Sequence, residues 1–487
     1  MSLPPSLATR PAGRPTAVAT LALVLSLTLS ACGSLAPAHQ RPEPDLPGQW
    51  PGAAAPAASA PASAAASATA AQPLAWQDLI TEPRLRQTVA LALERSPGWR
   101  QSLVAVEQSR AALGSADAAR WPSVRATLSQ TASRTPAEAS SSGAVVQSRV
   151  DSAALGFSAF ELDLFGRLRE QQDAARQTLL ASEQTLRSAQ LTLVAEVANA
   201  WLTLRADQAL LALAERTLAA QQDSLALVQR RATLGADSAL TLAQSQTSLE
   251  TARRDRASAA SQVRQDLNAL RLLLGTDLPE ALRPDADDSA QSARLVAVPE
   301  GLPSELLRQR PDVQAAEHAL YAADASLGAA RAARWPSLSL TASAGTASRG
   351  LSNLFQGGAW SLVPSLSLPL LDGGALASAE RSAELSRQSR ALAYEQAVQT
   401  AFREVADALA VREGLQQRLQ AQQGVVDATR RSLTLAQARW RAGAVSHLEV
   451  LDAQRSAYSA EQTLVSLRLA EQANRLTLFK VLGGTAA

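Results

Sequence analysis

Few residues of this chain are of the types that do chemistry. Its 487 residues include one cysteine, Cys32, and three histidines, His39, His318 and His447, which lie far apart in the sequence. The sequence has no glycine-rich phosphate-binding loop and no spacing of histidine, cysteine and carboxylate residues that is typical of a metal site. We therefore expect no catalytic site, no metal and no cofactor, and we predict that the protein is not an enzyme.

Two carboxylates near the C-terminal end are spaced so that they could act together. Glu449 and Asp452 lie three residues apart, which places both side chains on one face of a helix. Ser446 precedes Glu449 by three residues, the spacing of a capping box, in which the glutamate only accepts a hydrogen bond at the start of the helix. Glu449 could therefore either act together with Asp452 or only cap the helix, whereas a cap does not explain Asp452.

The single cysteine stands at the end of an export signal. Arg10 and Arg14 precede an apolar run that is too short for a transmembrane helix, so residues 1–31 are typical of a signal peptide. The run ends in LSAC, residues 29–32, which resembles the lipobox of bacterial lipoproteins. We predict that Cys32 is lipidated, with diacylglycerol and an amide-linked acyl chain that hold the mature chain in the membrane.

The residues after the cysteine predict to which membrane the lipoprotein would be sorted and how it would be tethered. Gly33 and Ser34 follow Cys32 with no aspartate, which resembles the pattern that sorts lipoproteins to the outer membrane. Residues 32–72 are rich in alanine, proline and serine, a composition that buries little surface. We expect this segment to be a tether.

Two long repeats make up most of the remaining chain. The stretch ARWPS at 119–123 recurs at 333–337, and further along residues 223–249 align with 431–457. The difference in residue number between the two copies, or offset, is smaller for the second pair of stretches than for the first. The first copy therefore contains extra residues between these two stretches. Such self-similarity predicts one pseudo-symmetric body built in duplicate. We assign the first repeat to 73–275, a linker to 276–302, the second repeat to 303–482 and a C-terminal tail to 483–487.

The composition favours close-packed helices and argues against one class of partner. Hydrophobic residues reach 46%, but aromatic residues only 3%, and much of the apolar content is alanine. The 46 lysine and arginine residues are nearly balanced by 44 acids, and no basic run occurs. We therefore expect no nucleic acid as a partner.

Each repeat contains two segments in which apolar and polar residues alternate with a period of two, which is typical of strands. In the first repeat Phe157 and Ala159 share one register, but the parity changes at Phe160, because Phe160, Leu162 and Leu164 occupy the other register. This change predicts a β-bulge, or the edge of the bilayer, near Ala159 and Phe160. The predicted strands cover about 121–133 and 150–164 in the first hairpin, and about 335–346 and 359–371 in the second.

Aromatic residues flank these strands. Rings at strand ends are typical of strands that cross a membrane, where they lie at the interface with water. We therefore predict four membrane-interface aromatics: Trp121, Phe160, Trp335 and Trp360.

Four strands cannot cross a membrane alone, because each unpaired backbone group at a sheet edge costs several kcal/mol in lipid. Copies of the chain must therefore combine their strands. Two copies would give eight strands and three would give twelve, and only the larger barrel leaves an evident lumen. We predict a homotrimer with a 12-stranded membrane β-barrel. The alternative is a soluble hairpin on a helical body.

A long helix follows each strand hairpin. Residues 167–232 contain neither proline nor glycine, which predicts a helix of roughly 100 Å. The second copy is predicted at 375–442, and return helices at 238–274 and 446–482 make antiparallel, coiled-coil-like pairs. Gly235 and Gly443 stand at the turns, where a left-handed cap would end each long helix.

Three stretches resemble one known family. They are residues 301–345, which contain the RPD-to-WPS run, FELDLFGRLRE at 160–170, and LEVLDAQRSAYSAEQ at 448–462. Together they resemble the signature stretches of the TolC-like outer-membrane factor family, in its lipoprotein efflux branch, over about 73–482. Tryptophan replaces the commoner phenylalanine in RWPS, and Phe160 stands where tryptophan is usual. Neither difference touches the architecture.

The resemblance implies a mainly α fold in which the 12-stranded outer-membrane barrel of a homotrimer continues into a periplasmic α-helical barrel. It implies a passive exit duct for small molecules, with a periplasmic adaptor, an inner-membrane pump and outer-membrane lipid as partners. Glu449 and Asp452 would lie at the periplasmic entrance, where acids of the subunits form rings. The adaptor-docking tips would comprise Leu234, Gly235, Ala236, Ala442, Gly443 and Ala444.

Localisation follows from these inferences, and two other functions stay open. We expect the protein in the cell outer membrane, both lipid-anchored and spanning, and extending into the periplasm. It could instead be the exit duct of a type I protein secretion system, or a structural lipoprotein with no pore. The likeness to the efflux branch favours the efflux duct.

Overall fold

The computed structural model describes residues 34–42, 75–285, 295 and 304–484. The predicted signal peptide, Cys32, residues 43–72 of the tether, most of the inter-repeat linker and residues 485–487 lie outside the described part. The chain divides into two compact units. Within the described residues, no helix is both long enough and apolar enough to cross a bilayer.

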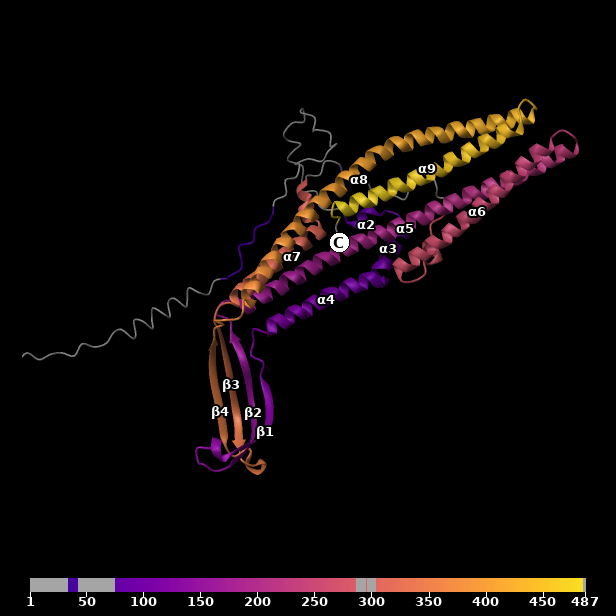
Figure 1. The fold of residues 1–487 in the computed structure, drawn as a ribbon. Coiled ribbons are helices and arrows are strands. Elements are labelled where there is room, and N and C mark those ends of the chain that lie inside the picture. Colours follow the sequence, from indigo (N-terminus) through magenta and orange to yellow (C-terminus); the bar gives the residue numbers. More distant parts are fainter. Residues whose placement is uncertain (1–33, 43–74, 286–294, 296–303, 485–487) are drawn as a thin grey trace, which may run out of the picture. The chain divides into compact units, whose positions relative to one another are not determined.

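The first unit contains residues 109–179 and 318–392 together with the described N-terminal residues 34–41. Its centre is an antiparallel sheet of four strands in the order β1-β2-β3-β4 (Figure 1). Short 3-10 turns lie in the two hairpin loops, at Ala137–Ala139 and Leu351–Asn353. The strands are β1 (Arg125–Thr135), β2 (Val146–Leu162), β3 (Ser337–Ser348) and β4 (Gly358–Ser367).

The second unit is helical and contains the described residues of 42–108, 180–317 and 393–484. It holds α2 (Trp76–Leu79), α3 (Pro83–Arg95), α6 (Ala239–Leu274) and α9 (His447–Val481), with 3-10 turns at Glu280–Leu282 and Ser304–Gln309. Four helices have residues in both units: α4 (Pro97–Ala118), α5 (Arg167–Thr233), α7 (Pro311–Ala332) and α8 (Ala375–Arg441).

The helices repeat with the two offsets seen in the sequence. Pro97 at the start of α4 and Pro311 at the start of α7 are separated by the same offset as the two ARWPS stretches. The starts of α5 and α8, Arg167 and Ala375, are separated by the smaller offset of the downstream alignment. The offset changes between these helices, so the extra residues of the first repeat lie in its strand hairpin.

The strands are offset from their predicted bounds. β1 starts at Arg125 and β3 at Ser337, later than predicted, because Trp121 and Trp335 belong to the turns that end α4 and α7. The N–H of Trp121 donates to the carbonyl of Ala118 at 3.1 Å, and that of Trp335 to Ala332 at 3.0 Å. β2 starts earlier, at Val146, and β4 ends earlier, at Ser367.

The main core of the helical unit includes part of the predicted linker. Trp201 of α5 is 2% exposed and packs with Leu274, Leu278 and Leu295, each nearly buried. The indole Nε1 of Trp201 donates to the carbonyl of Leu282 at 2.9 Å. Leu278, Leu282 and Leu295 of the predicted linker therefore pack against α5.

A second core lies where α7 begins beside α8 and the end of α9. Arg310 is buried there, and its Nη2 lies 2.7 Å from both Asp312 Oδ2 and Glu404 Oε2. Its Nη1 donates to the carbonyl of Val481 at 3.0 Å. Burial alone would lower the pKa of Arg310, but its hydrogen bonds with the two carboxylates outweigh burial and raise the pKa. The arginine of the RPD run therefore joins three helices.

Candidate functional site

The sheet has one apolar face, formed by all four strands. In the cross-strand pairs Leu338 lies opposite Leu366, and Ala342 lies opposite Leu362. Directly opposed residues point to the same side of a sheet. The same register adds Ala126 and Leu128 of β1, and Leu155, Phe157, Phe160 and Leu162 of β2, to this face.

A β-bulge in β2 keeps the apolar side chains of this strand on the apolar face. Phe157 pairs with Ala342, but Phe160 pairs with Leu340, so β2 contains one extra residue between the pairs. Ala159 adopts a φ of 52°, and its N–H donates to Thr341 Oγ1 at 3.0 Å. The rings of Phe157 and Phe160 therefore lie on one face, 6.1 Å apart. The bulge that the parity change predicted is confirmed, and its effect is to keep the apolar face continuous.

The opposite face of the sheet is polar. Ser343 and Ser361 face each other across β3 and β4, and their Oγ atoms are 3.1 Å apart. Ser129 and Ser152 make the same contact across β1 and β2 at 2.8 Å. Such hydroxyl pairs are compatible with water at this face.

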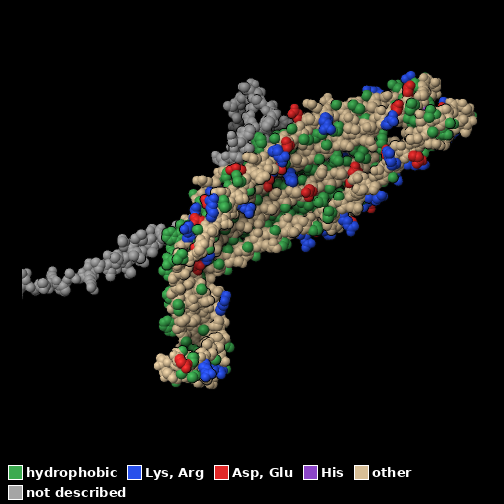
Figure 2. All heavy atoms as spheres, viewed as in Figure 1, with side chains coloured by type: hydrophobic (Ala, Val, Ile, Leu, Met, Phe, Trp, Pro, Cys, Tyr) green, Lys and Arg blue, Asp and Glu red, His purple; other side chains and the backbone are tan. Residues whose placement is uncertain are grey.

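Both faces are open within the described chain. The exposed fractions of Leu128, Leu155 and Leu366 are 74%, 61% and 69%, so the apolar face is not covered. Figure 2 shows few charged side chains along the visible side of the sheet, and a group of them at the hairpin loops. β1 and β4 form the two edges, and each pairs with a neighbouring strand on one side only.

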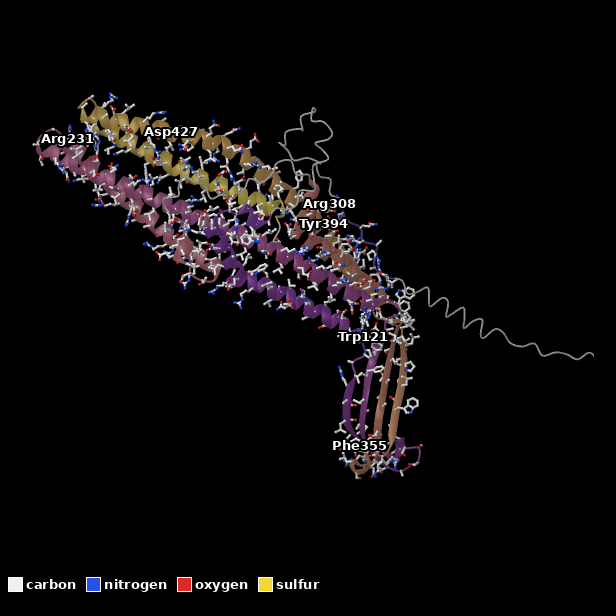
Figure 3. The ribbon with its side chains drawn as sticks, turned by 180° about the vertical axis from the view of Figure 1, so that it is seen from behind. Trp121, Arg231, Arg308, Phe355, Tyr394 and Asp427 are labelled. Atoms are coloured by element: carbon white, nitrogen blue, oxygen red, sulfur yellow. The ribbon has the colours of Figure 1, made fainter. Side chains whose placement is uncertain are left out.

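The four predicted interface aromatics lie toward opposite ends of the sheet. Trp121, Trp335 and Phe160 are at the end where the strands join the helices, and Trp360 is near the hairpin loops, opposite Ala344. Figure 3 labels Trp121 at the first end and Phe355 at the other. Trp121 and Trp360 are 76% and 80% exposed. The indole of Trp335 stacks on the ring of Phe165, with ring centroids 5.3 Å apart.

The predicted tip residues end the two helical hairpins. Gly235 and Gly443 have φ values of 74° and 73°. The N–H of Ala236 donates to Arg231 O at 2.8 Å, and that of Ala444 to Arg439 O at 2.9 Å, so each long helix ends in a Schellman motif. The side chains around both glycines are exposed, Leu234 to 83%.

A buried cluster that the sequence analysis did not identify joins the two hairpins near their tips. Val228 of α5, Trp440 of α8 and Val450 of α9 pack together. The Arg231 guanidinium, labelled in Figure 3, lies 5.2 Å from the centre of the Trp440 ring. A tryptophan near the end of an alanine-rich helix was the signal that could have revealed this cluster.

His447 belongs to the same cluster. Its side chain is buried, with Nε2 3.1 Å from Ser224 Oγ of α5 and Nδ1 3.3 Å from Ser245 Oγ of α6. Burial lowers the pKa of His447; the Asp237 carboxylate opposes this effect and the Arg231 guanidinium adds to it. The imidazole is therefore neutral at pH 7 and connects the second repeat to both helices of the first.

The two predicted entrance acids each have an arginine partner within the chain. Glu449 Oε2 lies 3.8 Å from an Nη of Arg439, and Asp452 forms an ion pair with Arg455. The serine half of the predicted capping box does not form, because the Ser446 side chain makes no capping hydrogen bond. Asp452 lines a groove of about 530 Å³ among α5, α6 and α9.

A pair of carboxyl groups on α5 and α6 was also missed. Asp266 is 7% exposed, and its Oδ1 accepts a hydrogen bond from Gln262 Nε2 at 3.0 Å. Burial raises the pKa of Asp207 to about 7, and the hydrogen bond and charge of Asp266 act in the same direction. The two residues stand on different helices, and no local pattern in the sequence connects them.

Residues 34–41, predicted to be part of a free tether, lie along the first unit as a strap (Figure 1). Ser34 donates a hydrogen bond to Glu170 of α5, and the carbonyl of Leu35 accepts one from Arg331 of α7 at 3.3 Å. The His39 ring stacks on Tyr321 at 3.5 Å, and its Nδ1 lies 2.8 Å from Asp324 Oδ2.

The strap is seated closely and is linked to a further helix. Arg387 of α8 donates to Asp324 Oδ1 at 2.6 Å, so the aspartate that binds His39 also binds α8. A Cβ atom at Gly328 would lie 2.8 Å from Ala36 Cβ, so the close approach of the strap requires glycine there. The expectation that the whole tether buries little surface is therefore wrong for the strap, which packs against α7.

Known structures share this fold over nearly the whole chain. The structure of a membrane protein from Pseudomonas aeruginosa has 36% identical residues and a TM-score of 0.85, covering 93% of this chain and 100% of that one. The open state of the Neisseria gonorrhoeae MtrE outer membrane channel has 32% identity and a TM-score of 0.80, covering 93% and 98%.

Sequence relatives agree with the structures. The toluene efflux pump outer membrane protein TtgF of Pseudomonas putida is 42% identical over 467 residues, 95% of this chain and 96% of the relative. Outer membrane protein OprJ of P. aeruginosa is 38% identical over 466 residues, 95% of each chain. Residues 88–276 and 302–484 match the family described as outer membrane efflux protein. With its two-faced sheet and paired helical hairpins, the chain belongs to the outer membrane efflux protein family.

Proposed function

We propose that the protein is a homotrimeric, passive exit duct in the outer membrane, through which small molecules leave a tripartite efflux system. The observation that carries the proposal is the sheet, whose apolar face is in register across four strands. Among the described residues, its edges β1 and β4 each pair on one side only. In lipid, each unpaired backbone group costs several kcal/mol, so the edges must close on other strands.

Three copies would close the sheet into a barrel of twelve strands, with β1 of one copy beside β4 of the next. The apolar face would then contact lipid, and the serine-rich face would line the lumen. Two copies would supply eight strands, whose interior is filled largely by side chains. The helices α5, α6, α8 and α9 of each copy would continue the duct as a periplasmic helical barrel.

The exposed hairpin tips support docking of a periplasmic adaptor, which would connect the duct to an inner-membrane pump. Leu234, Ala236, Ala442 and Ala444 are exposed around the glycines that end α5 and α8. Glu449 and Asp452 would lie near the entrance, where their arginine partners reduce the net charge of the ring. The name of the relative TtgF, a toluene efflux pump component, supports a small-molecule cargo.

Lipidation of Cys32 would add an anchor to the barrel, and the protein would carry no other cofactor. The lipobox supports this assignment, and so does the strap, which fixes the chain from Ser34 onward against α5 and α7.

The test combines transport in cells with conductance of the purified protein. In a strain that lacks the gene for this protein, the Ala444→Trp variant should fail to restore resistance to exported compounds. The variant should still form detergent-resistant trimers that conduct ions in a planar bilayer. Ala428→Trp, an exposed change on α8 away from the tip, is the matched control and should retain resistance.

The other outcomes separate the parts of the proposal. Normal resistance of Ala444→Trp would contradict docking at the tips. Absence of conductance in the unsubstituted trimer would contradict the duct. Loss of a secreted protein without loss of resistance in the deletion strain would favour type I secretion.

A further inference from the structure

A mainly apolar pocket lies in the first unit, where the sheet meets the start of α5 and α8. Its volume is about 510 Å³. The Trp335 indole, 52% exposed, stacks on Phe165 and gives the pocket a flat aromatic wall. The other apolar lining residues include Leu162, Leu164, Pro369 and Leu376.

The charged residues of this pocket are already bound to neighbours in the chain. Arg167 Nε donates to Glu161 Oε1 at 2.9 Å, and Asp163 accepts from the N–H of Arg169 at 2.8 Å. Asp372 accepts from the N–H groups of Gly374 and Leu376 at 2.9 and 2.7 Å. The surface left for a ligand is mainly apolar, with Ser337 and Ser367 as neutral polar groups, which suits a hydrocarbon chain rather than an ion.

The strap leads to this pocket. Ser34 is held by Glu170, one helical turn after Arg167, and Leu35 is held by Arg331, the residue before Ala332. Arg167 and Ala332 both line the pocket. Cys32 precedes Ser34 by two residues, a span of at most about 7 Å in an extended chain.

We propose that one acyl chain of the lipid on Cys32 lies in this pocket, against the stacked rings of Phe165 and Trp335. The inference rests on the proposed lipidation of Cys32 and adds a binding site for the lipid on the protein itself. The membrane anchor would then be held beside the end of the sheet where Trp335 and Phe160 lie.

The experiment places a photo-crosslinking residue in the pocket of the full-length protein. Phe165 and Trp335 are replaced, one at a time, by p-benzoylphenylalanine in cells fed an alkynyl fatty acid. Trp121→p-benzoylphenylalanine is the matched control, because Trp121 is the first-repeat equivalent of Trp335 and does not line the pocket. After illumination, mass spectrometry should find the lipid-bearing N-terminal peptide joined to position 165 or 335, and this adduct should be absent at position 121.

Each other outcome has a separate meaning. Absence of the alkynyl label on Cys32 would refute lipidation and, with it, the inference. A labelled Cys32 with no more adduct at 165 and 335 than at 121 would refute the docking site and leave lipidation intact. Adducts at 165 and 335 that carry the mass of free phospholipid would show that bilayer lipid occupies the pocket, and this result would also overturn the inference.

Discussion

At the scale of single residues, Arg310 shows why a charged residue stands in the core of the helical unit. Its guanidinium binds two carboxylates and the carbonyl of Val481 while its side chain is only 7% exposed. Breaking a buried pair leaves the partner charge without compensation. Asp312 and Glu404 are 44% and 37% exposed, so water would partly replace the lost arginine.

We expect Arg310→Met to reduce the free energy of unfolding by about 3 kcal/mol, the low end of the range for a broken buried pair. Thermal unfolding of the protein in detergent, followed by circular dichroism, measures the change. Arg308→Met is the control, because Arg308, labelled in Figure 3, is exposed two residues away. Equal losses in the two variants would contradict a special role for Arg310.

The Asp207 and Asp266 pair makes stability depend on pH. The pKa of Asp207 is raised in the fold to about 7 from its ordinary value of 3.8. A carboxyl group with a raised folded pKa binds its proton more tightly in the folded state. Its contribution to stability is therefore complete below about pH 4 and is lost as the pH rises through about 7.

Asp207→Asn should remove this dependence, because the amide does not titrate. The wild-type melting temperature should fall between pH 5 and 8.5 by more than that of the variant, and at the upper pH the variant should be the more stable of the two. Asp223→Asn, an exposed change on the same helix, should keep the wild-type slope. A wild-type slope in Asp207→Asn would mean that another group is responsible.

At the scale of elements, the sheet separates two environments by the side to which each residue points. Ala342 and Ser343 are neighbours on β3, yet Ala342 lies on the apolar face opposite Leu362, and Ser343 lies on the polar face opposite Ser361. The same charged side chain at these two positions therefore tests the assignment of the faces.

Ala342→Arg should prevent assembly in the outer membrane, because an arginine on a lipid face near the bilayer centre costs about 2–4 kcal/mol. Ser343→Arg should assemble and lower the conductance, since its charge would stand in the lumen. The amount of heat-modifiable trimer in outer-membrane fractions measures assembly. If both variants assemble equally, the apolar face does not contact lipid.

The strap is a second element whose position can be tested. Gly328→Leu should displace it, because any Cβ at 328 would come within 2.8 Å of Ala36. The amides of residues 35, 36, 38 and 39 should then exchange hydrogen faster than in the wild type, while α7 stays helical. Gly114→Leu, at the equivalent position of the first repeat, has no atom within 4 Å of its Cβ and should leave the strap protected. Unchanged exchange in Gly328→Leu would contradict the tight seat.

At the scale of the whole molecule, the two sheet edges decide how many copies assemble. Closed barrels remove unpaired edges, and a ring of identical chains closes only at one number of copies. In the proposed trimer, twelve strands from three copies would satisfy both edges of every copy and leave a lumen. The proposed duct therefore depends on the edge contact between copies.

Cysteines on the two edge strands should join the copies into trimers and no further. We expect Thr127→Cys, combined in turn with Ser361→Cys, Val363→Cys or Ser365→Cys, to give disulfide-linked dimers and trimers on oxidation. Non-reducing electrophoresis counts the linked chains. Thr127→Cys with Ala154→Cys, which pair within one chain, should give monomers only. Linked species larger than a trimer, or dimers alone for every pair, would contradict the trimer.

Much of the architecture was predictable because it depends on neighbours in the chain. The strand alternation, the long helices and the glycine caps at Gly235 and Gly443 arise from local patterns and backbone preferences. Even the bulge before Phe160 was visible, because an extra residue changes the parity of the side chains. The residues at the two helical turns could therefore be located from the sequence, whereas the later starts of β1 and β3 follow from turns at Trp121 and Trp335 that the sequence did not indicate.

Only the tertiary structure decided which distant residues meet. The arginine partner of Glu449, the contacts of His447 with Ser224 and Ser245, and the pair of Asp207 with Asp266 depend on how the helices pack. The seat of Ala36 on Gly328 likewise joins the N-terminal strap to a helix of the second repeat. Local periodicity shows which face of a helix or strand is apolar. Which two faces meet depends on tertiary packing, because many contacts between residues distant in the sequence determine that packing together.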